Sequence, residues 1–180
     1  MATKSSPRTV DAVETALQII ELLQERDGAG ITEIARELGR SKGTVHSHMA
    51  TLAKNEYVVK EDGIYRLSLR YLELAETVTD RLQIYDVVRN ELDDLAAECG
   101  ELAQFATEEH GRAVYLYKTG GENAVQTASS TGDREYLHCI SLGKAMMAHM
   151  SRERVEEIID RHGLEGFTDS TITSKSELFD

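Results

Sequence analysis

The sequence predicts an α+β fold in which a helical head with a β-hairpin is followed by a linker helix and then an α/β region with an antiparallel sheet. Apolar residues recur at helical spacing over much of residues 10–55. Residues 57–67 contain two β-rich runs separated by an Asp-Gly pair, and strand periodicity returns after Gly100. The expected boundaries are a head at 1–67, a linker at 68–84 and a third region at 85–180.

Composition excludes several classes of protein. The chain has 180 residues, of which 41% are hydrophobic, and this is enough to build a buried core. No apolar run approaches the roughly 20 residues that span a bilayer, and residues 1–9 are polar and basic, unlike a signal peptide. Two cysteines, Cys99 and Cys139, are too few for a disulfide framework. We therefore expect a cytoplasmic protein with no membrane partner.

The charge is unevenly placed along the chain. Residues 1–70 hold 10 Lys and Arg and 10 Asp and Glu, whereas the whole chain holds 20 and 32, for a net charge of −12. The acidic excess therefore lies after residue 70, so only the head would tolerate a polyanion. So acidic a composition also fits a salt-adapted source such as a halophilic archaeon, and an ordinary acidic soluble protein is the alternative.

Two helices are expected at the start of the head. The first covers about residues 10–24, and residues 27–30 break it with two glycines. The second takes Thr32 as its N-cap and ends at Gly39. The apolar face of the first helix comprises Ala12, Ala16, Ile19, Ile20 and Leu23.

A third helix opens at Ser41 and runs to about residue 55. Val45, Met49 and Leu52 lie at i, i+4 and i+7, so they face the core, and the polar face beside them contains no acid. Two β-rich runs around the Asp-Gly turn then predict a hairpin. Three helices, a glycine turn before the third, and a hairpin form the order of a winged helix-turn-helix.

This arrangement predicts a DNA-binding surface, because the third helix of such a module enters the major groove. Lys42 can meet a phosphate or a guanine, and the free N–H groups behind Ser41 suit a phosphate oxygen. Arg40, in the turn, favours a phosphate. A trihelical module that binds protein is the alternative. The expected DNA contacts are Thr32, Arg40, Ser41, Lys42, Gly43, Thr44, His46, Ser47, Lys60 and Arg66.

Two more helices are expected next. The helix at about residues 68–82 has a narrow apolar stripe, which either joins two copies of the chain or belongs to an ordinary core. The helix at 85–98 continues one apolar face. The stripe residues are Leu72, Ala75, Val78 and Leu82 in the first helix, and Val88, Leu92, Leu95 and Cys99 in the second.

After Gly100, strands are predicted at 102–107 and 112–117 with a turn at 109–111. A weaker third strand is expected at 124–128, and residues 136–139 are expected to be extended. Ser141 should then cap a helix to Met150, and further helices are expected at 152–162 and from Ser174 onward.

The head resembles the DNA-binding domain of the IclR family of regulators. The resemblance is carried by ALQIIELL at residues 16–23, ITEIARELG at 31–39, SKGTVHSHMATL at 41–52 and the hairpin at 57–67. A second match, YLHCISLGKAMMA at residues 136–148, is similar to the family's segment at the rim of the effector pocket.

The resemblance implies a dimer or tetramer that binds operator DNA and responds to a small-molecule effector, often an organic acid. It implies that the linker helix joins two heads, and that family members continue beyond the equivalent of Asp180. Ser47 and His48 depart from the family pattern, which leaves operator specificity open. The implied effector residues are His138, Ile140, Ser141, Leu142 and Gly143.

No other chemistry stands out, and we expect no catalytic residue, metal or cofactor. His138 and Cys139 are adjacent in an extended run and would point to opposite faces, so they do not form a metal site. The competing hypotheses are a small-molecule-binding enzyme that uses Cys139 as nucleophile, and a protein-interaction adaptor.

Overall fold

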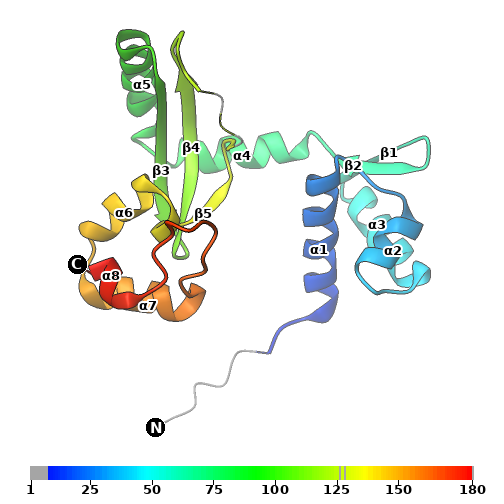
Figure 1. Ribbon diagram of the computed structural model, residues 1–180. Coiled ribbons are helices and arrows are strands. Elements are labelled where there is room, and N and C mark those ends of the chain that lie inside the picture. The colour runs from blue at the N-terminus through cyan, green and yellow to red at the C-terminus, as the bar shows by residue number, and fades with distance from the viewer. Residues whose placement is uncertain (1–7, 126, 128, 180) are drawn as a thin grey trace. The chain divides into compact units, whose positions relative to one another are not determined.

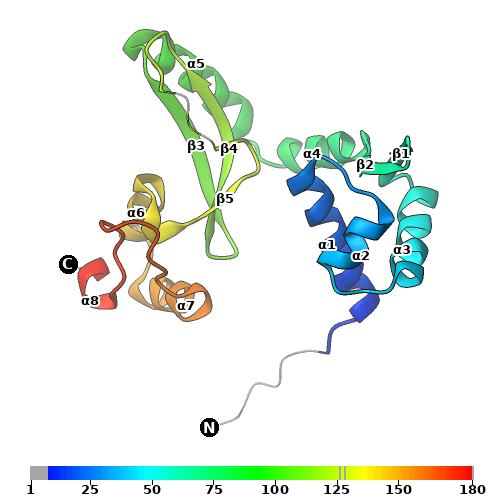
Figure 2. The ribbon, with the colours of Figure 1, turned by 45° about the vertical axis from the view of Figure 1, so that its right-hand side comes forward.

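The computed structural model describes residues 8–125, 127 and 129–179. It divides into two compact units, Met1–Arg81 and Leu82–Asp180, shown in Figures 1 and 2. We call them the head unit and the C-terminal unit and describe each by itself.

The head unit contains the predicted three helices and hairpin. Its elements are α1 (Asp11–Arg26), α2 (Ile31–Glu37), α3 (Lys42–Lys54), β1 (Val58–Glu61), β2 (Ile64–Leu67) and α4 (Arg70–Asp80). One predicted cap was wrong, because Gly30 is the N-cap of α2 and Thr32 lies exposed in its first turn. Ser41 is the N-cap of α3, as predicted.

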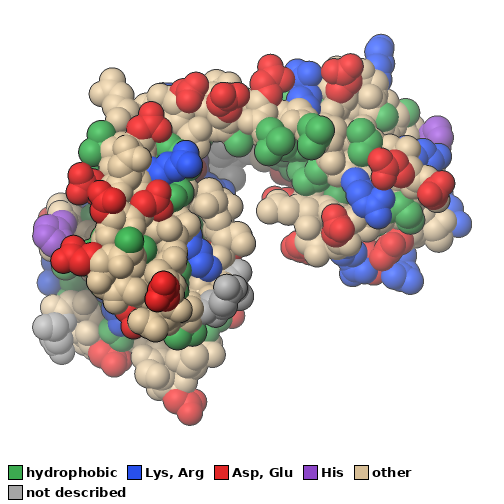
Figure 3. All heavy atoms as spheres, turned by 90° about the horizontal axis from the view of Figure 1, so that it is seen from above, with side chains coloured by type: hydrophobic (Ala, Val, Ile, Leu, Met, Phe, Trp, Pro, Cys, Tyr) green, Lys and Arg blue, Asp and Glu red, His purple; other side chains and the backbone are tan. Residues whose placement is uncertain are grey.

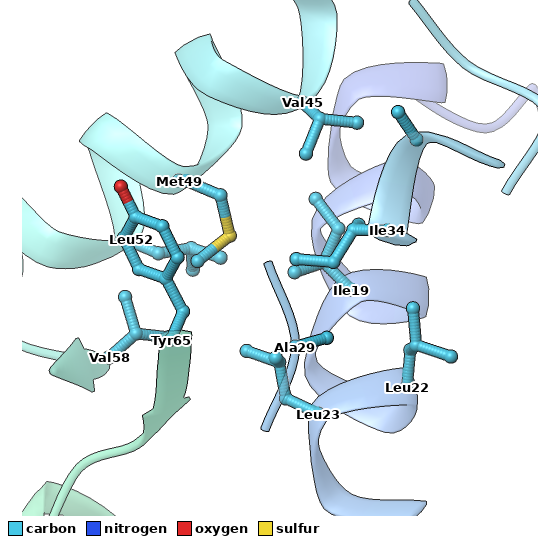
Figure 4. Close-up of a cluster of buried hydrophobic side chains, with 11 residues drawn as sticks. Ile19, Leu22, Leu23, Ala29, Ile34, Val45, Met49, Leu52, Val58 and Tyr65 are labelled. Carbon is cyan, nitrogen blue, oxygen red and sulfur yellow. The ribbon is translucent and has the colours of Figure 1, made fainter. Parts of the chain in front are cut away.

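A single apolar cluster holds the head unit together. Figure 4 shows Ile19 of α1, Ile34 of α2 and Met49 of α3 converging on one centre, and each is 0% exposed. Val45 and Leu52 complete the buried side of α3. The buried face of α1 is formed by Thr15, Ile19, Leu22 and Leu23, and Ala12 is exposed instead of buried. The core therefore decides which side of α3 meets solvent.

The hairpin is tied to the head by a link that sequence patterns did not predict. Ala29, in the loop after α1, exchanges two backbone hydrogen bonds of 3.0 Å with Tyr65 of β2. The hairpin turn places Asp62 and Gly63 at φ values of 51° and 86°, the left-handed conformation of a tight hairpin turn. We call β1, β2 and this turn the wing.

The C-terminal unit is built on a three-stranded antiparallel sheet in the order β3–β4–β5. Helix α5 packs along β3 and β4 (Figures 1 and 2). A second core cluster lies where β3, β4 and the 3-10 turn η1 meet α6 and α7. The elements are α5 (Tyr85–Cys99), β3 (Leu102–Glu109), β4 (Arg112–Gly120), β5 (Arg134–Tyr136), η1 (Leu137–Cys139), α6 (Ser141–Ala148), α7 (Arg152–His162) and α8 (Lys175–Phe179).

Two expectations for this unit were wrong. Ala124, Val125 and Thr127 are not in a strand, and residues 126 and 128 lie outside the described residues. The third strand is β5 instead, because Arg134 to Tyr136 pair with β4. Residues 137–139 form a 3-10 turn rather than an extended run.

The buried face of α5 also differs from the prediction. Ala96 is 2% exposed, whereas Leu95 is 50% exposed and Cys99 is exposed. The face toward the sheet is therefore Val88, Leu92 and Ala96 at i, i+4 and i+8. The expected cap of α6 was also wrong, because Ile140 is the N-cap and Ser141 is the first residue of the helix.

Gly143 is required where α6 passes η1. A Cβ atom built on Gly143 would lie 2.2 Å from the carbonyl oxygen of Leu137 and 2.5 Å from its Cα. Both atoms belong to backbone, so no side-chain rotation can relieve the contact. Glycine at this position lets α6 begin directly against η1.

We expect Gly143→Ala to lower the free energy of unfolding by about 1–3 kcal/mol, the usual cost of overpacking a core contact. Thermal unfolding followed by circular dichroism measures this. Gly43→Ala is the matched control, because a Cβ there would meet only the Ser41 hydroxyl at 3.8 Å. It should raise stability through better helix propensity. Equal unfolding temperatures for Gly143→Ala and the wild type would contradict the close-packing argument.

Candidate nucleic-acid interface and effector segment

The polar side of α3 is the candidate nucleic-acid interface. Ser41, Lys42, Gly43, Thr44, His46 and Ser47 are all exposed, as predicted for a surface that meets a ligand. Helix α3 contains no Asp or Glu, although the chain has 32 of them. Because Val45, Met49 and Leu52 are buried on the opposite side, this surface cannot turn inward without exposing the core.

The first turn of α3 has a defined set of donors and acceptors. The Ser41 Oγ accepts from the Thr44 N–H at 3.0 Å and lies 2.9 Å from the Thr44 Oγ1. The N–H groups of Lys42 and Gly43 belong to the first turn, where no helical carbonyl reaches them. Two free backbone donors therefore lie at this end of α3, where a phosphate oxygen could bind, and Lys42 adds a cation to the same exposed turn.

The remaining predicted contacts flank α3 and do not form one cluster with it. Arg40 precedes the N-cap, and its Nη2 donates to the Asp11 Oδ1 at 2.8 Å. On the wing, the Arg66 Nη1 lies 3.6 Å from the Glu61 Oε2. The two flanking arginines are thus each paired with a carboxylate.

Lys60 and Arg66 lie on opposite faces of the wing. Lys60 pairs with Tyr65 in the register and Val59 pairs with Arg66, and successive pairs of a hairpin face opposite sides. The Lys60 ammonium lies 5.2 Å from the centre of the Tyr65 ring, within cation–π range. Both cations were predicted as DNA contacts from the sequence, and the register places them on different faces.

The two acidic partners, Asp11 and Glu61, were not predicted from the sequence. Glu61 and Arg66 are diagonal neighbours across the hairpin, so the Asp-Gly turn could have predicted their pairing. Asp11 and Arg40 are 29 residues apart on separate elements, and no local pattern connects them.

Figure 3 shows how charge is distributed on one face of each unit. The surface of the C-terminal unit, on the left, carries many red carboxylate side chains and few blue ones. This agrees with the acidic excess after residue 70. A polyanion is therefore repelled less by the head unit than by the C-terminal unit.

The predicted effector segment surrounds the start of α6. Ile140 is the N-cap and provides no side-chain cap, so the N–H groups of Ser141, Leu142 and Gly143 form an uncapped first turn. Ser141 is exposed, and Gly143 is buried against η1. The geometry can hold a carboxylate at Ser141.

His138 contributes to this segment mainly as an internal support. Its side chain is buried, with 4% of the residue exposed, and its Nε2 lies 2.9 Å from the Glu165 carbonyl oxygen. This bond orients the ring toward the chain that follows α7. A separate open pocket of about 400 Å³ lies beside the other end of α6, and its lining includes Lys144, Met147 and Arg152 but none of the predicted effector residues.

Cys139 lacks the chemistry of a nucleophile. Its Sγ lies 3.2 Å from the His138 Nε2, but that nitrogen already contacts the Glu165 carbonyl. Burial raises the pKa of the Cys139 thiol, and the negative charges of Glu135 and Glu165 raise it further. The thiol therefore stays protonated at neutral pH and is a poor nucleophile.

The described residues contain neither a metal-binding cluster nor a membrane-spanning helix. No group of three or more His, Cys, Asp and Glu side chains among them is placed to hold a metal ion. No helix within residues 8–125 and 129–179 is both long enough and apolar enough to cross a bilayer.

Comparison with protein families matches both units. The IclR helix-turn-helix domain matches residues 12–62. The bacterial transcriptional regulator IclR C-terminal domain matches residues 76–180, which is more than half of the chain. The chain belongs to the IclR family of transcriptional regulators. The relatives that it matches are transcriptional regulators rather than enzymes.

Similar IclR-family proteins come from archaea and bacteria. A probable transcriptional regulator ArcR of Halobacterium salinarum is 32% identical over 88% of this chain and 62% of its own length. The regulator XynR of Escherichia coli is 28% identical over 94% of this chain and 68% of its own length. The chain thus spans about three fifths of the length of the archaeal relative.

Solved structures share the IclR-family fold. A regulator from Alicyclobacillus acidocaldarius has a TM-score of 0.76 at 24% identity and covers 96% of this chain and 71% of its own. An IclR homologue from Microbacterium hydrocarbonoxydans, solved with 4-hydroxybenzoate, has a TM-score of 0.77 at 22% identity and covers 93% and 70%. At these identities, the likeness concerns the fold.

Proposed function

We propose that this protein binds operator DNA through α3 and regulates transcription in the cytoplasm, where bacterial and archaeal chromosomes lie. The observation that carries this is the exposed polar surface of α3, which has no acid although the molecule is strongly anionic. In this proposal, residues 1–67 form the DNA-binding head, 68–84 the linker and 85–180 the effector region.

The roles of the individual residues follow from their positions. Lys42, Thr44, His46 and Ser47 face the bases or phosphates, and Gly43 permits close approach of the backbone. Ser41, as N-cap, presents the free N–H groups to a phosphate. Arg40, Lys60, Arg66 and Thr32 contact the DNA backbone on either side of α3.

We expect the double variant Lys42→Ala and Thr44→Ala to bind operator DNA about tenfold more weakly or worse, because a good base contact is worth about 1–3 kcal/mol. A gel-shift titration on the DNA upstream of the protein's own gene measures this. Glu156→Gln, on α7, is the control and should bind like the wild type. An unchanged affinity for the double variant would contradict the assignment of α3 as the recognition helix.

We further propose that an organic acid binds at the start of α6 and modulates DNA binding. The uncapped N–H groups of Ser141, Leu142 and Gly143 would hold its carboxylate, with His138 and Ile140 supporting them from the preceding turn. The family match over residues 76–180 supports an effector-binding role. The bound 4-hydroxybenzoate of the related structure supports this chemical class.

Ser141→Pro tests the backbone donor directly, because proline at the first helical position removes one N–H without breaking the helix. We expect it to weaken binding of 4-hydroxybenzoate by about tenfold or more, the worth of a hydrogen bond to a charged group. Calorimetric titration measures the affinity. Ser141→Ala keeps the N–H and should bind like the wild type, so equal losses in both variants would show that the hydroxyl matters instead.

We also propose that α4 joins two copies of the chain. No residue of α4 is buried, and Leu72 and Val78 are 67% and 51% exposed. The alternative from the sequence, an intrachain core for this stripe, therefore has no support in the described residues. The start of α4 is anchored on the head, because Tyr71 packs edge-on against Tyr57 at 5.7 Å between ring centres.

We expect Leu72→Lys to shift the protein from dimer to monomer, because a charge would replace apolar contact within the stripe. Sedimentation velocity measures the mass in solution. Thr77→Lys adds the same charge on another side of α4 and should leave the dimer intact. A wild-type chain that sediments as a monomer, or a Leu72→Lys variant that remains dimeric, would contradict the role of α4.

A further inference from the structure

The two arginines that flank α3 are each restrained by an acid of the same unit. Arg40 immediately precedes the N-cap of α3, and its guanidinium reaches the Asp11 carboxylate on the first turn of α1 at 2.8 Å. The side chains are 36% and 74% exposed, so this ion pair lies at the surface. Arg66 on the wing lies 3.6 Å from Glu61 in a looser pair.

Lys42 differs from these arginines. Among the residues that the structure describes, no carboxylate lies within 4 Å of its ammonium. The two arginine–carboxylate pairs therefore lie in the turn and on the wing, the places expected to touch the DNA backbone, and not in the helix expected to meet the bases. Lys60 of the wing, over the Tyr65 ring, has no such pair among the described residues.

The two kinds of contact have different consequences for binding. Every DNA duplex presents phosphates, so a cation that contacts a phosphate strengthens binding to all sequences alike. An acid beside that cation weakens binding to all sequences alike, because it competes for the guanidinium and repels the phosphate. Base contacts made by α3 are left at full strength, so they supply a larger share of the total affinity for operator DNA.

The pair between Arg40 and Asp11 is suited to this role because it is weak enough to open. Exposed ion pairs contribute only about 0–1 kcal/mol to folding. The Asp11 carboxylate occupies Nη2, which leaves the Nη1 and Nε donors of Arg40 for a phosphate. DNA can therefore share or displace Asp11, but only against the attraction of the pair.

We propose that Asp11 limits sequence-independent DNA binding by restraining Arg40, and so sets how much of the affinity of the head unit comes from phosphate contacts. The inference rests on the proposed DNA-binding function. It differs from two other roles for the same contact. A purely structural ion pair would affect stability and leave DNA affinity alone. A positioning acid that aims Arg40 at a phosphate would make binding weaker when removed.

The test compares Asp11→Asn with the wild-type chain on a duplex of unrelated sequence, over a series of salt concentrations. We expect about two- to fivefold tighter binding, the worth of one exposed charge pair, and a steeper fall of affinity with salt, because Arg40 releases more counterion. Binding to operator DNA should gain no more than this, and thermal unfolding should change little.

Two further variants isolate the pair. Glu14→Gln removes the same charge from the same first turn of α1 and should tighten binding much less, because no described cation pairs with Glu14. In an Arg40→Gln background, Asp11→Asn should lose its effect. Equal gains in Glu14→Gln and Asp11→Asn would overturn the inference in favour of a general charge effect.

The remaining outcomes are equally decisive. An unchanged or weaker affinity for Asp11→Asn, with a wild type that binds duplex DNA, overturns the role of Asp11 alone. A folded wild-type chain that binds no duplex at any salt concentration overturns the proposed function, and this inference with it.

Discussion

The packing of α3 against α1 and α2 is the contact on which the head unit depends. Val45 and Met49 are fully buried against Ile19 and Ile34. Their burial fixes the orientation of α3 about its own axis. Turning the helix would place apolar atoms in water, at roughly 25 cal/mol for each Å². The polar surface of α3 therefore faces solvent because the opposite side of the helix is buried.

A different constraint operates in the C-terminal unit, where backbone meets backbone. Gly143 allows α6 to begin against the Leu137 carbonyl, and this contact sets the position of the first turn of α6. The glycine named as an effector residue from the sequence thus has a packing reason of its own. Packing and ligand binding can both require a glycine, because the absence of a Cβ atom lets another backbone or a ligand approach the chain closely.

Elements with strong periodicity could be predicted, and elements defined by their partners could not. Helix α7 begins and ends at Arg152 and His162, as expected, and the β3–β4 hairpin follows from alternation. The third strand was misplaced because residues 134–136 become a strand only through pairing with β4. The ion pair of Asp11 and Arg40 joins positions 29 residues apart, so only the folded core brings them together. Candidate contacts on α3 were predictable because helical phase decides exposure.

The register of the wing has a geometric consequence. Lys60 and Arg66 stand on opposite faces of a two-stranded ribbon. A ribbon with a cation on each face touches both sugar–phosphate walls of a groove only when it enters edge-first, and a ribbon laid flat engages one wall and leaves the other cation in water. If the proposed backbone contacts of Lys60 and Arg66 form together, the thickness of the ribbon selects grooves of a fitting width, and groove width varies with base composition.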